Sequence, residues 1–240
     1  MIRRRLAGAV FLVLVIPDPG RGQATCPLGA LEAELESSHP VKEGYYGLTV
    51  ALSGDSLACS APVEDVGAIQ EAGAVYVLDH VGSGWVEQAW LVSSTPRMGD
   101  QFGLGLDLDL DTVAVGAPFA DQNGMADGNV TVFVRNGSSF AEQAVLGQPT
   151  GQNGAAFGWA LALNGDRLAV GAPYYDHGVG PGSGAVFVFP RSAGVWTLDG
   201  ALTASDPAAP DWFGYALHLS AHPVLVGAYG KGSSNQGAAY

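Results

Sequence analysis

Large hydrophobic residues alternate with small or polar ones along residues 102–118 (FGLGLDLDLDTVAVGAP), which predicts a β-hairpin with its turn near residues 109–111. The same pattern recurs without a gap at residues 46–62, 157–173 and 213–229. The four copies begin 56, 55 and 56 residues apart. A fixed period of this size with strand-like content indicates a repeat architecture.

Each repeat is long enough for four strands, and in the second copy we expect them at residues 103–109, 112–117, 129–135 and 140–146. Four antiparallel strands in every repeat predict an all-β fold, a β-propeller with one blade per repeat. The predicted units are residues 46–101, 102–156, 157–212 and an incomplete 213–240. They give about three complete blades plus a partial one.

Residues 25–45 are expected to be a lead-in that contains the last strand of a blade, at 29–35. Leu35 lies 11 residues before Tyr46, and three later leucines have the same spacing to the next aromatic–glycine pair: Leu91, Leu146 and Leu202. Two interpretations follow. Either the chain is a segment of a larger propeller, which we favour, or strand 29–35 completes the last blade and closes a four-bladed ring.

Residues 1–24 have the features of a signal peptide: a basic start, an apolar core and a small-residue cleavage site at Gly22-Gln23-Ala24. We therefore expect the protein to be secreted or held at the cell surface. Removing this segment takes away four arginines and one aspartate, so the formal charge changes from −13 to −16. So acidic a chain repels phosphate backbones and anionic lipid, which argues against nucleic-acid and membrane-surface partners.

The sequence has two cysteines, Cys26 and Cys59. Cys59 occupies a strand position that is valine in the other copies, which favours a small buried apolar residue. A disulfide between the two remains an alternative in an oxidising compartment.

The repeats resemble FG-GAP repeats, the blades of the integrin alpha-subunit propeller and of many exported bacterial proteins. The residues that carry the resemblance are Phe102-Gly103 with Gly116-Ala117-Pro118, and Phe157-Gly158 with Gly171-Ala172-Pro173. The two flanking copies match more loosely, and the resemblance covers about residues 29–240. It implies a propeller that serves extracellular recognition or adhesion.

Members of that family often bind Ca²⁺ in the first hairpin turn through a D-x-D-x-D-G loop. Asp107, Asp109 and Asp111 have the aspartate spacing, but Thr112 stands in place of the glycine and the turn is not lengthened. Calcium needs six to eight oxygen ligands from a loop that curls around it. The three aspartates are therefore only weak Ca²⁺ candidates, and we expect them to shape the turn; no cofactor is assigned.

The loops between strands two and three, and between one blade and the next, should emerge on one face of the propeller. Variable loops on a rigid scaffold are where binding residues concentrate. The candidates on this face are Glu64, Asp65, Asp121, Asp127, Tyr174, Tyr175, Asp176, Asp211 and Trp212.

Sequence signatures of catalysis are missing. The five histidines show no metal-ligand spacing, and no serine lies in a G-x-S-x-G elbow. His218 and Asp107 replace small residues of the first strands and could line the central channel, but irregular packing is the explanation that we favour. We therefore expect a non-catalytic binding or adhesion module for a protein or glycan. The alternatives are the propeller part of an exported hydrolase or lyase, and a structural spacer of a larger surface protein.

Overall fold

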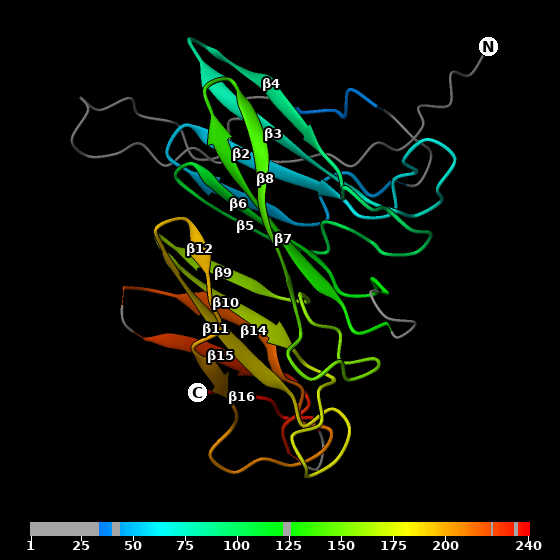
Figure 1. Ribbon diagram of the computed structural model, residues 1–240, viewed down its shortest axis with the longest axis vertical. Coiled ribbons are helices and arrows are strands. Elements are labelled where there is room, and N and C mark those ends of the chain that lie inside the picture. Colours follow the sequence, from blue (N-terminus) through cyan, green and yellow to red (C-terminus); the bar gives the residue numbers. More distant parts are fainter. Residues whose placement is uncertain (1–33, 40–43, 122–125, 222, 233–234) are drawn as a thin grey trace.

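Four antiparallel β-sheets follow one another along the long axis of the molecule (Figure 1). The computed structural model describes residues 34–39, 44–121, 126–221, 223–232 and 235–240. The predicted signal peptide, Cys26 and most of the expected strand 29–35 lie outside these ranges. The prediction of an all-β fold with one antiparallel sheet per repeat is confirmed, and we refer to the sheets as blades 1 to 4.

Within blades 1 and 2, each strand pairs with the next one along the chain. Blade 1 contains β1 (Val50–Ser53), β2 (Ser56–Ala61), β3 (Ala74–Val81) and β4 (Gly84–Leu91), and blade 2 contains β5 (Gly105–Asp109), β6 (Thr112–Ala117), β7 (Asn129–Asn136) and β8 (Ser139–Gly147). Blade 3 contains β9 (Leu161–Asn164), β10 (Arg167–Ala172), β11 (Ala185–Ser192), and the short β12 (Val195–Trp196) and β13 (Gly200–Leu202), which both pair with β11. In its described residues blade 4 contains β14 (Phe213–Leu219), β15 (Val224–Ala228) and β16 (Ala238–Ala239).

The repeated Phe-Gly and Gly-Ala-Pro segments meet both within a blade and between blades. Inside blade 2, Gly103 N donates to Gly116 O at 2.9 Å. Across the joint to blade 3, a Cβ added to Gly116 would lie 2.9 Å from the carbonyl carbon of Gly158 and closer still to its oxygen. The next joint repeats this close approach, with Gly171 against Gly214. Glycine is needed there because the two backbones leave no room for a side chain.

The hydrophobic core lies between the blades. We call the face of a blade that turns toward the preceding blade its leading face, and the opposite face its trailing face. At the joint between blades 1 and 2, Leu106 and Leu108 of the leading face pack with Ala58, Val75 and Val77 of the trailing face. Large residues thus interdigitate with small ones, as the alternating pattern predicts.

Two of the four equally spaced leucines differ from the sequence-based expectation. Leu35 is buried among the leading-face residues of blade 1, as Leu91 and Leu146 are at later joints, but it does not lie in a strand. Leu202 pairs with Val186 in the expected register, yet 42% of it is exposed. The reason is that the described part of blade 4 lacks a fourth strand to cover it.

Leu110 forms the hairpin turn of blade 2 in the left-handed region, with φ of 52°. Glycines occupy the same turn position in blades 1 and 3, Gly54 at φ 58° and Gly165 at φ 56°. Leu110 is 70% exposed, so its side chain gains little from packing. An L-residue with a side chain costs about 1–2 kcal/mol in this region.

We therefore expect Leu110→Gly to stabilise the protein by about 0.5–1 kcal/mol, after allowance for the greater backbone entropy of glycine in the unfolded chain. Urea unfolding of the purified variant measures this. The reverse change, Gly54→Leu, tests the same effect in blade 1, because an added Cβ there meets no atom within 4 Å. A loss of stability in Leu110→Gly would contradict the argument.

Within the described residues Cys59 forms no disulfide, and its thiol is buried in the core on the leading side of blade 1. Burial raises the pKa of this thiol to about 11, although a hydrogen bond with Tyr46 acts in the opposite direction. Because the thiolate is the reactive form, we expect Cys59 in a Cys26→Ser background to resist a thiol reagent at pH 8 until the chain unfolds. Rapid labelling of the folded protein would show that this prediction is wrong.

Candidate functional site

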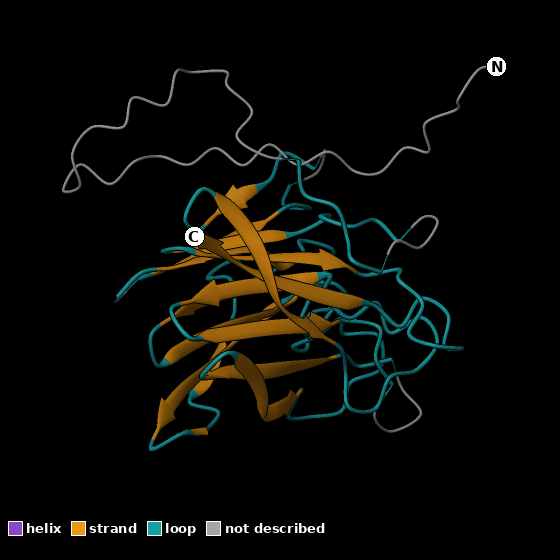
Figure 2. Ribbon diagram, turned by 90° about the horizontal axis from the view of Figure 1, so that it is seen from above, coloured by secondary structure: helices purple, strands orange, loops and turns teal. Residues whose placement is uncertain are grey.

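Six aromatic side chains form a connected cluster at the end of the blades where the first strands begin and the second strands finish. The longer loops gather at this edge of the stacked sheets, which Figure 2 shows from above. We call the cluster the aromatic surface, and its members are Phe119, Trp159, Tyr174, Trp212, Tyr215 and Tyr229.

The rings of the aromatic surface contact one another edge to face and face to face. Trp212 and Tyr229 are stacked, with centroids 5.6 Å apart and 7° between their planes, and Tyr215 and Tyr229 are stacked at 5.2 Å. Trp159 lies 5.3 Å from Tyr215 and 5.8 Å from Tyr174. Such pairs add about 0.5–1.5 kcal/mol beyond the burial of their area, so they hold one another in place.

The aromatic surface is open to solvent. Tyr229 is 57% exposed and Phe119 is 38% exposed, and the other four rings are half-buried. None of the six belongs to the hydrophobic clusters between the blades. A contiguous exposed group of aromatic rings is a feature that marks binding sites on soluble proteins.

Two glycines make room for the Trp212 indole. A Cβ added to Gly182 would lie 3.1 Å from Trp212 Nε1, and one added to Gly230 would lie 3.1 Å from Trp212 Cε3. The Trp212 backbone donates to Gly182 O at 2.8 Å and has φ of 54°. The equivalent residues before the other three aromatic–glycine pairs share this conformation, so it belongs to the architecture of the blade rather than to a ligand site: Tyr45, Gln101 and Ala156.

The nine loop residues that the sequence indicates divide into two groups. Tyr174 and Trp212 belong to the aromatic surface. The other seven are buried, pack against the core, or pair with nearby residues of the loops. Glu64, Asp127 and Asp211 are buried, and Tyr175 packs against the core between blades 2 and 3. Asp65 accepts from Glu71 N, Asp176 accepts from Gly178 N and Gly180 N, and Asp121 forms an ion pair with Arg97 at 4.0 Å.

Glu64 is a buried, hydrogen-bonded carboxylate, although its position in a loop suggests an exposed side chain. Its carboxylate accepts from Tyr76 Oη at 2.7 Å and from Trp90 Nε1 at 3.1 Å. Burial raises the pKa of this carboxyl above its usual value, although both hydrogen bonds act in the opposite direction. Only 1% of Glu64 is exposed, so a ligand on the surface would not reach it.

Four members of the aromatic surface were not found by sequence reasoning: Phe119, Trp159, Tyr215 and Tyr229. A signal for three of them is present in the aligned repeats. Trp159 and Tyr215 follow the Phe-Gly pair where blades 1 and 2 have leucine, and Tyr229 replaces the proline of the Gly-Ala-Pro segment. Aromatic residues at these aligned positions become neighbours only because consecutive blades stack in register.

The three aspartates of the blade 2 hairpin make different contacts and do not converge on one site. Asp107 accepts from Leu163 N at 2.6 Å and Asp109 accepts from Gly165 N at 2.6 Å, so both join blade 2 to blade 3. Asp111 is exposed and lies 3.6 Å from Arg135 in an ion pair. Within the described ranges, no group of three or more His, Cys, Asp or Glu side chains is placed to hold a metal ion.

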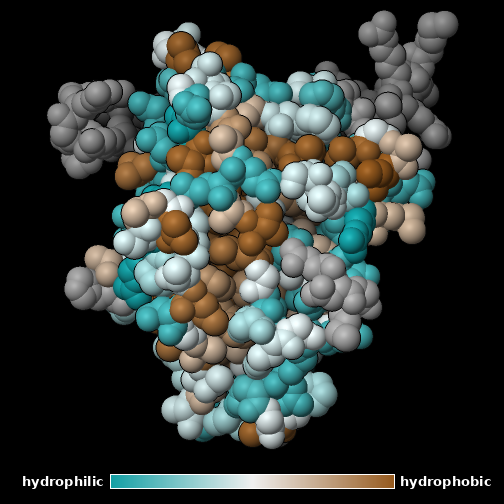
Figure 3. Space-filling view, viewed as in Figure 1, coloured by the Kyte–Doolittle hydropathy of each residue, from teal (hydrophilic) through white to brown (hydrophobic). Residues whose placement is uncertain are grey.

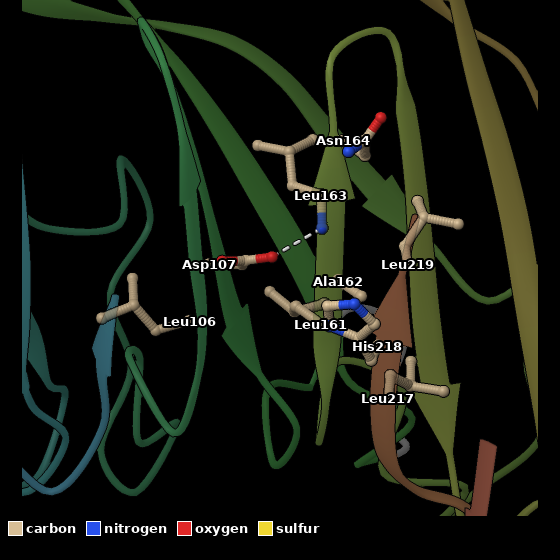
Figure 4. Close-up of a pocket in the computed structure, with 9 residues that line it drawn as sticks. All are labelled: Leu106, Asp107, Leu161, Ala162, Leu163, Asn164, Leu217, His218 and Leu219. Atoms are coloured by element: carbon tan, nitrogen blue, oxygen red, sulfur yellow. Dashed lines mark hydrogen bonds between the residues drawn. The ribbon is translucent and has the colours of Figure 1, made fainter. Parts of the chain in front are cut away.

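A cavity of about 340 Å³ lies between the first strands of blades 2, 3 and 4, where the channel of a propeller runs (Figure 4). Asp107 and His218 both line it, as the channel interpretation of the sequence expects. Burial raises the pKa of Asp107, while the Leu163 and Leu108 amides and the nearby His218 act in the opposite direction. Both Asp107 oxygens already accept backbone hydrogen bonds, so the carboxylate is occupied by the fold.

The four stacked antiparallel sheets, joined through glycine contacts, define this protein as a β-propeller repeat protein. The chain belongs to the FG-GAP repeat family, whose model matches residues 85–133, 140–189 and 196–240. No curated protein matches the sequence. In the part of the chain that the structure describes, no helix has the length and apolar character needed to span a bilayer.

Among solved structures, the chain is similar to one chain of an S. cerevisiae complex, a Dbp5 variant bound to Nup159, a Gle1 variant, IP6 and ADP. The two sequences are 13% identical and the TM-score is 0.40. The match covers 85% of the present chain and 42% of that chain, so the present chain spans less than half of its length.

Proposed function

We propose that this protein is an exported, non-catalytic binding module that takes a protein or glycan ligand on the aromatic surface of its loop face. The observation that carries the proposal is the cluster of six partly exposed rings on a rigid stack of sheets. Tryptophan and tyrosine supply large contact areas at little cost in conformational entropy, and they dominate the energetics of many interfaces.

The surroundings of the cluster support the same class of function. Its rings come from three blades and pack against one another, so they hold their positions before any ligand arrives, and preorganisation reduces the cost of binding. The acidic chain disfavours polyanionic ligands, which leaves neutral or basic surfaces as partners. The apolar faces of sugar rings and the side chains of an extracellular protein both meet this requirement.

The test is binding of the mature chain to a glycan array and to an array of extracellular protein domains. We expect ligands on one of the two arrays, and we expect Trp159→Ala and Trp212→Ala each to weaken binding about 30-fold or more, as loss of a central aromatic residue does. Trp85→Ala is the matched control, because it removes a half-buried indole near the opposite, hairpin end of blade 1.

Equal binding by the control and by the wild type is expected. The proposal is wrong if both arrays are negative, or if the two aromatic-surface variants bind as tightly as the wild type while circular dichroism shows that they are folded.

A further inference from the structure

Four aromatic residues at the joint between blades 3 and 4 depart from the repeat that the rest of the chain follows. Trp159 and Tyr215 stand directly after the Phe-Gly pair, where blades 1 and 2 have leucine. The position of Trp212 is glutamine before blade 2 and alanine before blade 3, and that of Tyr174 is valine in blade 1. The blade architecture therefore forms without these rings elsewhere. A local departure from a rule that the other repeats obey points to function.

Exposure of apolar side chains is not what distinguishes these four residues. Figure 3 shows apolar residues at several points of one face of the molecule. Met98 and Val195, for example, are 75% and 60% exposed. Scattered exposure of this kind is normal in soluble proteins. What sets the four rings apart is the state of their polar atoms.

Four polar atoms of these rings make no hydrogen bond with any residue that the structure describes: Trp159 Nε1, Tyr174 Oη, Trp212 Nε1 and Tyr215 Oη. The buried side-chain atoms that lack a partner belong to other residues, so these four atoms are open to water. Aromatic residues inside the fold differ. Tyr76 Oη donates to Glu64 at 2.7 Å, and Trp196 Nε1 donates to Gln143 at 2.8 Å. The joint between blades 3 and 4 thus keeps two indole and two phenol groups available for a ligand.

The aromatic surface offers no charged partner to a ligand. In the described part of the chain, the cations that lie over aromatic rings are Arg135 over Phe140 and Arg191 over Trp196, and neither pair includes a ring of this surface. A charged ligand group placed here would lose water without gaining an opposite charge. The formal charge of −13 adds a general repulsion of anions.

The area of the aromatic surface fits a ligand much smaller than a folded protein. At about 200 Å² for a whole aromatic side chain, its six rings leave roughly 400 Å² exposed. Each partner in a stable protein–protein interface contributes about 800 Å². A few sugar rings match the smaller area, and each sugar combines an apolar C–H face with hydroxyl groups at its edge.

We infer that the aromatic surface binds a neutral glycan. Its rings receive the C–H faces of the sugars, and the indole and phenol groups of Trp159, Tyr174, Trp212 and Tyr215 hydrogen-bond the sugar hydroxyl groups. This inference rests on the proposed function and narrows it, because acidic glycans and folded protein domains are excluded as the main ligand. The centre of the site lies at the joint between blades 3 and 4, to which all four residues belong.

Two arrays test the inference on the mature chain. One carries neutral oligosaccharides of glucose, mannose, xylose, galactose and N-acetylhexosamines beside uronate-rich, sialylated and sulfated ones, and the other carries extracellular protein domains. We expect the strongest signals on neutral oligosaccharides. If the strongest ligands are acidic glycans or protein domains, the inference is overturned while the proposed binding function stands. Two negative arrays contradict both.

Removal of a single oxygen atom tests the hydrogen-bonding groups, by calorimetric titration with the neutral oligosaccharide that gives the strongest array signal. Tyr215→Phe keeps the ring and should weaken binding about fivefold, as loss of one hydrogen bond does. Tyr215→Ala also removes the ring and should weaken binding about 30-fold. Tyr215→Phe should unfold at the wild-type temperature, because the structure gives its hydroxyl no partner among the described residues.

Tyr45→Phe is the matched control. Tyr45 holds the position of Trp212 in blade 1 and is 59% exposed, and it does not belong to the aromatic surface. The variant loses the same oxygen atom and should bind the oligosaccharide like the wild type. Unchanged affinity in Tyr215→Phe, or an equal loss in Tyr45→Phe, would overturn the inference.

Discussion

Gly116→Ala is expected to destabilise the folded protein severely, by about 4 kcal/mol or more from a total that is typically 5–15 kcal/mol. Gly116 lies in β6 at the joint with blade 3, and an added Cβ would meet the carbonyl carbon of Gly158 at 2.9 Å and its Cα at 3.1 Å. Both are backbone atoms in a packed joint, so no rotation of a side chain relieves the overlap. The two blades would have to separate and expose the core between them.

Thermal and urea unfolding of the purified variant measure this loss, with soluble yield as a first indication. Gly84→Ala is the matched control, because Gly84 also lies in a strand, β4, but an added Cβ meets nothing within 4 Å. Its stability should stay within about 1 kcal/mol of the wild type. If Gly116→Ala unfolds at the wild-type midpoint, the close glycine contact does not have the importance assigned to it here.

Arg135→Ala is expected to cost about 2–3 kcal/mol at neutral pH, toward the lower end for a broken ion pair because this pair is only partly buried. Arg135 on β7 of blade 2 donates to both oxygens of Asp79 on β3 of blade 1, at 2.8 and 2.9 Å. Its guanidinium also donates to Ser56 Oγ at 3.0 Å. The side chains of Arg135 and Asp79 are 16% and 23% exposed, so the variant leaves a poorly solvated carboxylate without its partner.

The cost of Arg135→Ala should depend on pH. Burial alone would raise the pKa of Asp79, but the hydrogen bonds and charge of Arg135 outweigh it and hold that pKa below the usual value. A carboxyl whose pKa is lowered by folding contributes stability above its unfolded pKa, and this stability is lost as the pH falls through the folded pKa. The difference between wild type and variant should therefore be largest near pH 6–7 and shrink below about pH 4, the ordinary pKa of aspartate.

Urea unfolding at a series of pH values measures this difference. Arg191→Ala is the control, since Arg191 is the aligned residue of blade 3 but its partner Asp166 is 68% exposed. A well-exposed pair contributes about 1 kcal/mol or less, so this variant should lose less stability and show a weaker pH dependence. A constant difference for Arg135→Ala from pH 3 to pH 7 would contradict the role given to Asp79.

The sequence predicts the blades well because their strands depend on local alternation and on a period that four copies repeat. It predicts the site poorly because the site depends on which side chains meet when blades stack. Glu64 lies in a loop two residues after Pro62 and looks available to a ligand, yet Tyr76 of β3 and Trp90 of β4 enclose it. Trp159 and Tyr229 are 70 positions apart in the chain, and only the register between blades brings both to one surface.

Leu35, at the described end of the segment expected to form a strand, shows a related limit. The spacing of Leu35 correctly indicates that it packs on the face of the following blade, but spacing alone does not establish hydrogen bonding to a neighbouring strand. Burial and backbone pairing are separate properties, and a hydrophobic pattern reports mainly the first.

The glycine joints have a consequence for how such a protein can change its length. Where Gly116 approaches Gly158, and Gly171 approaches Gly214, the closest contact involves main chain alone. Apart from the glycines themselves, it therefore makes no demand on the identity of the side chains carried by either unit. Duplication or loss of a whole unit leaves this fit intact, so a gene of this kind can gain or shed modules while the loops of each one diverge freely.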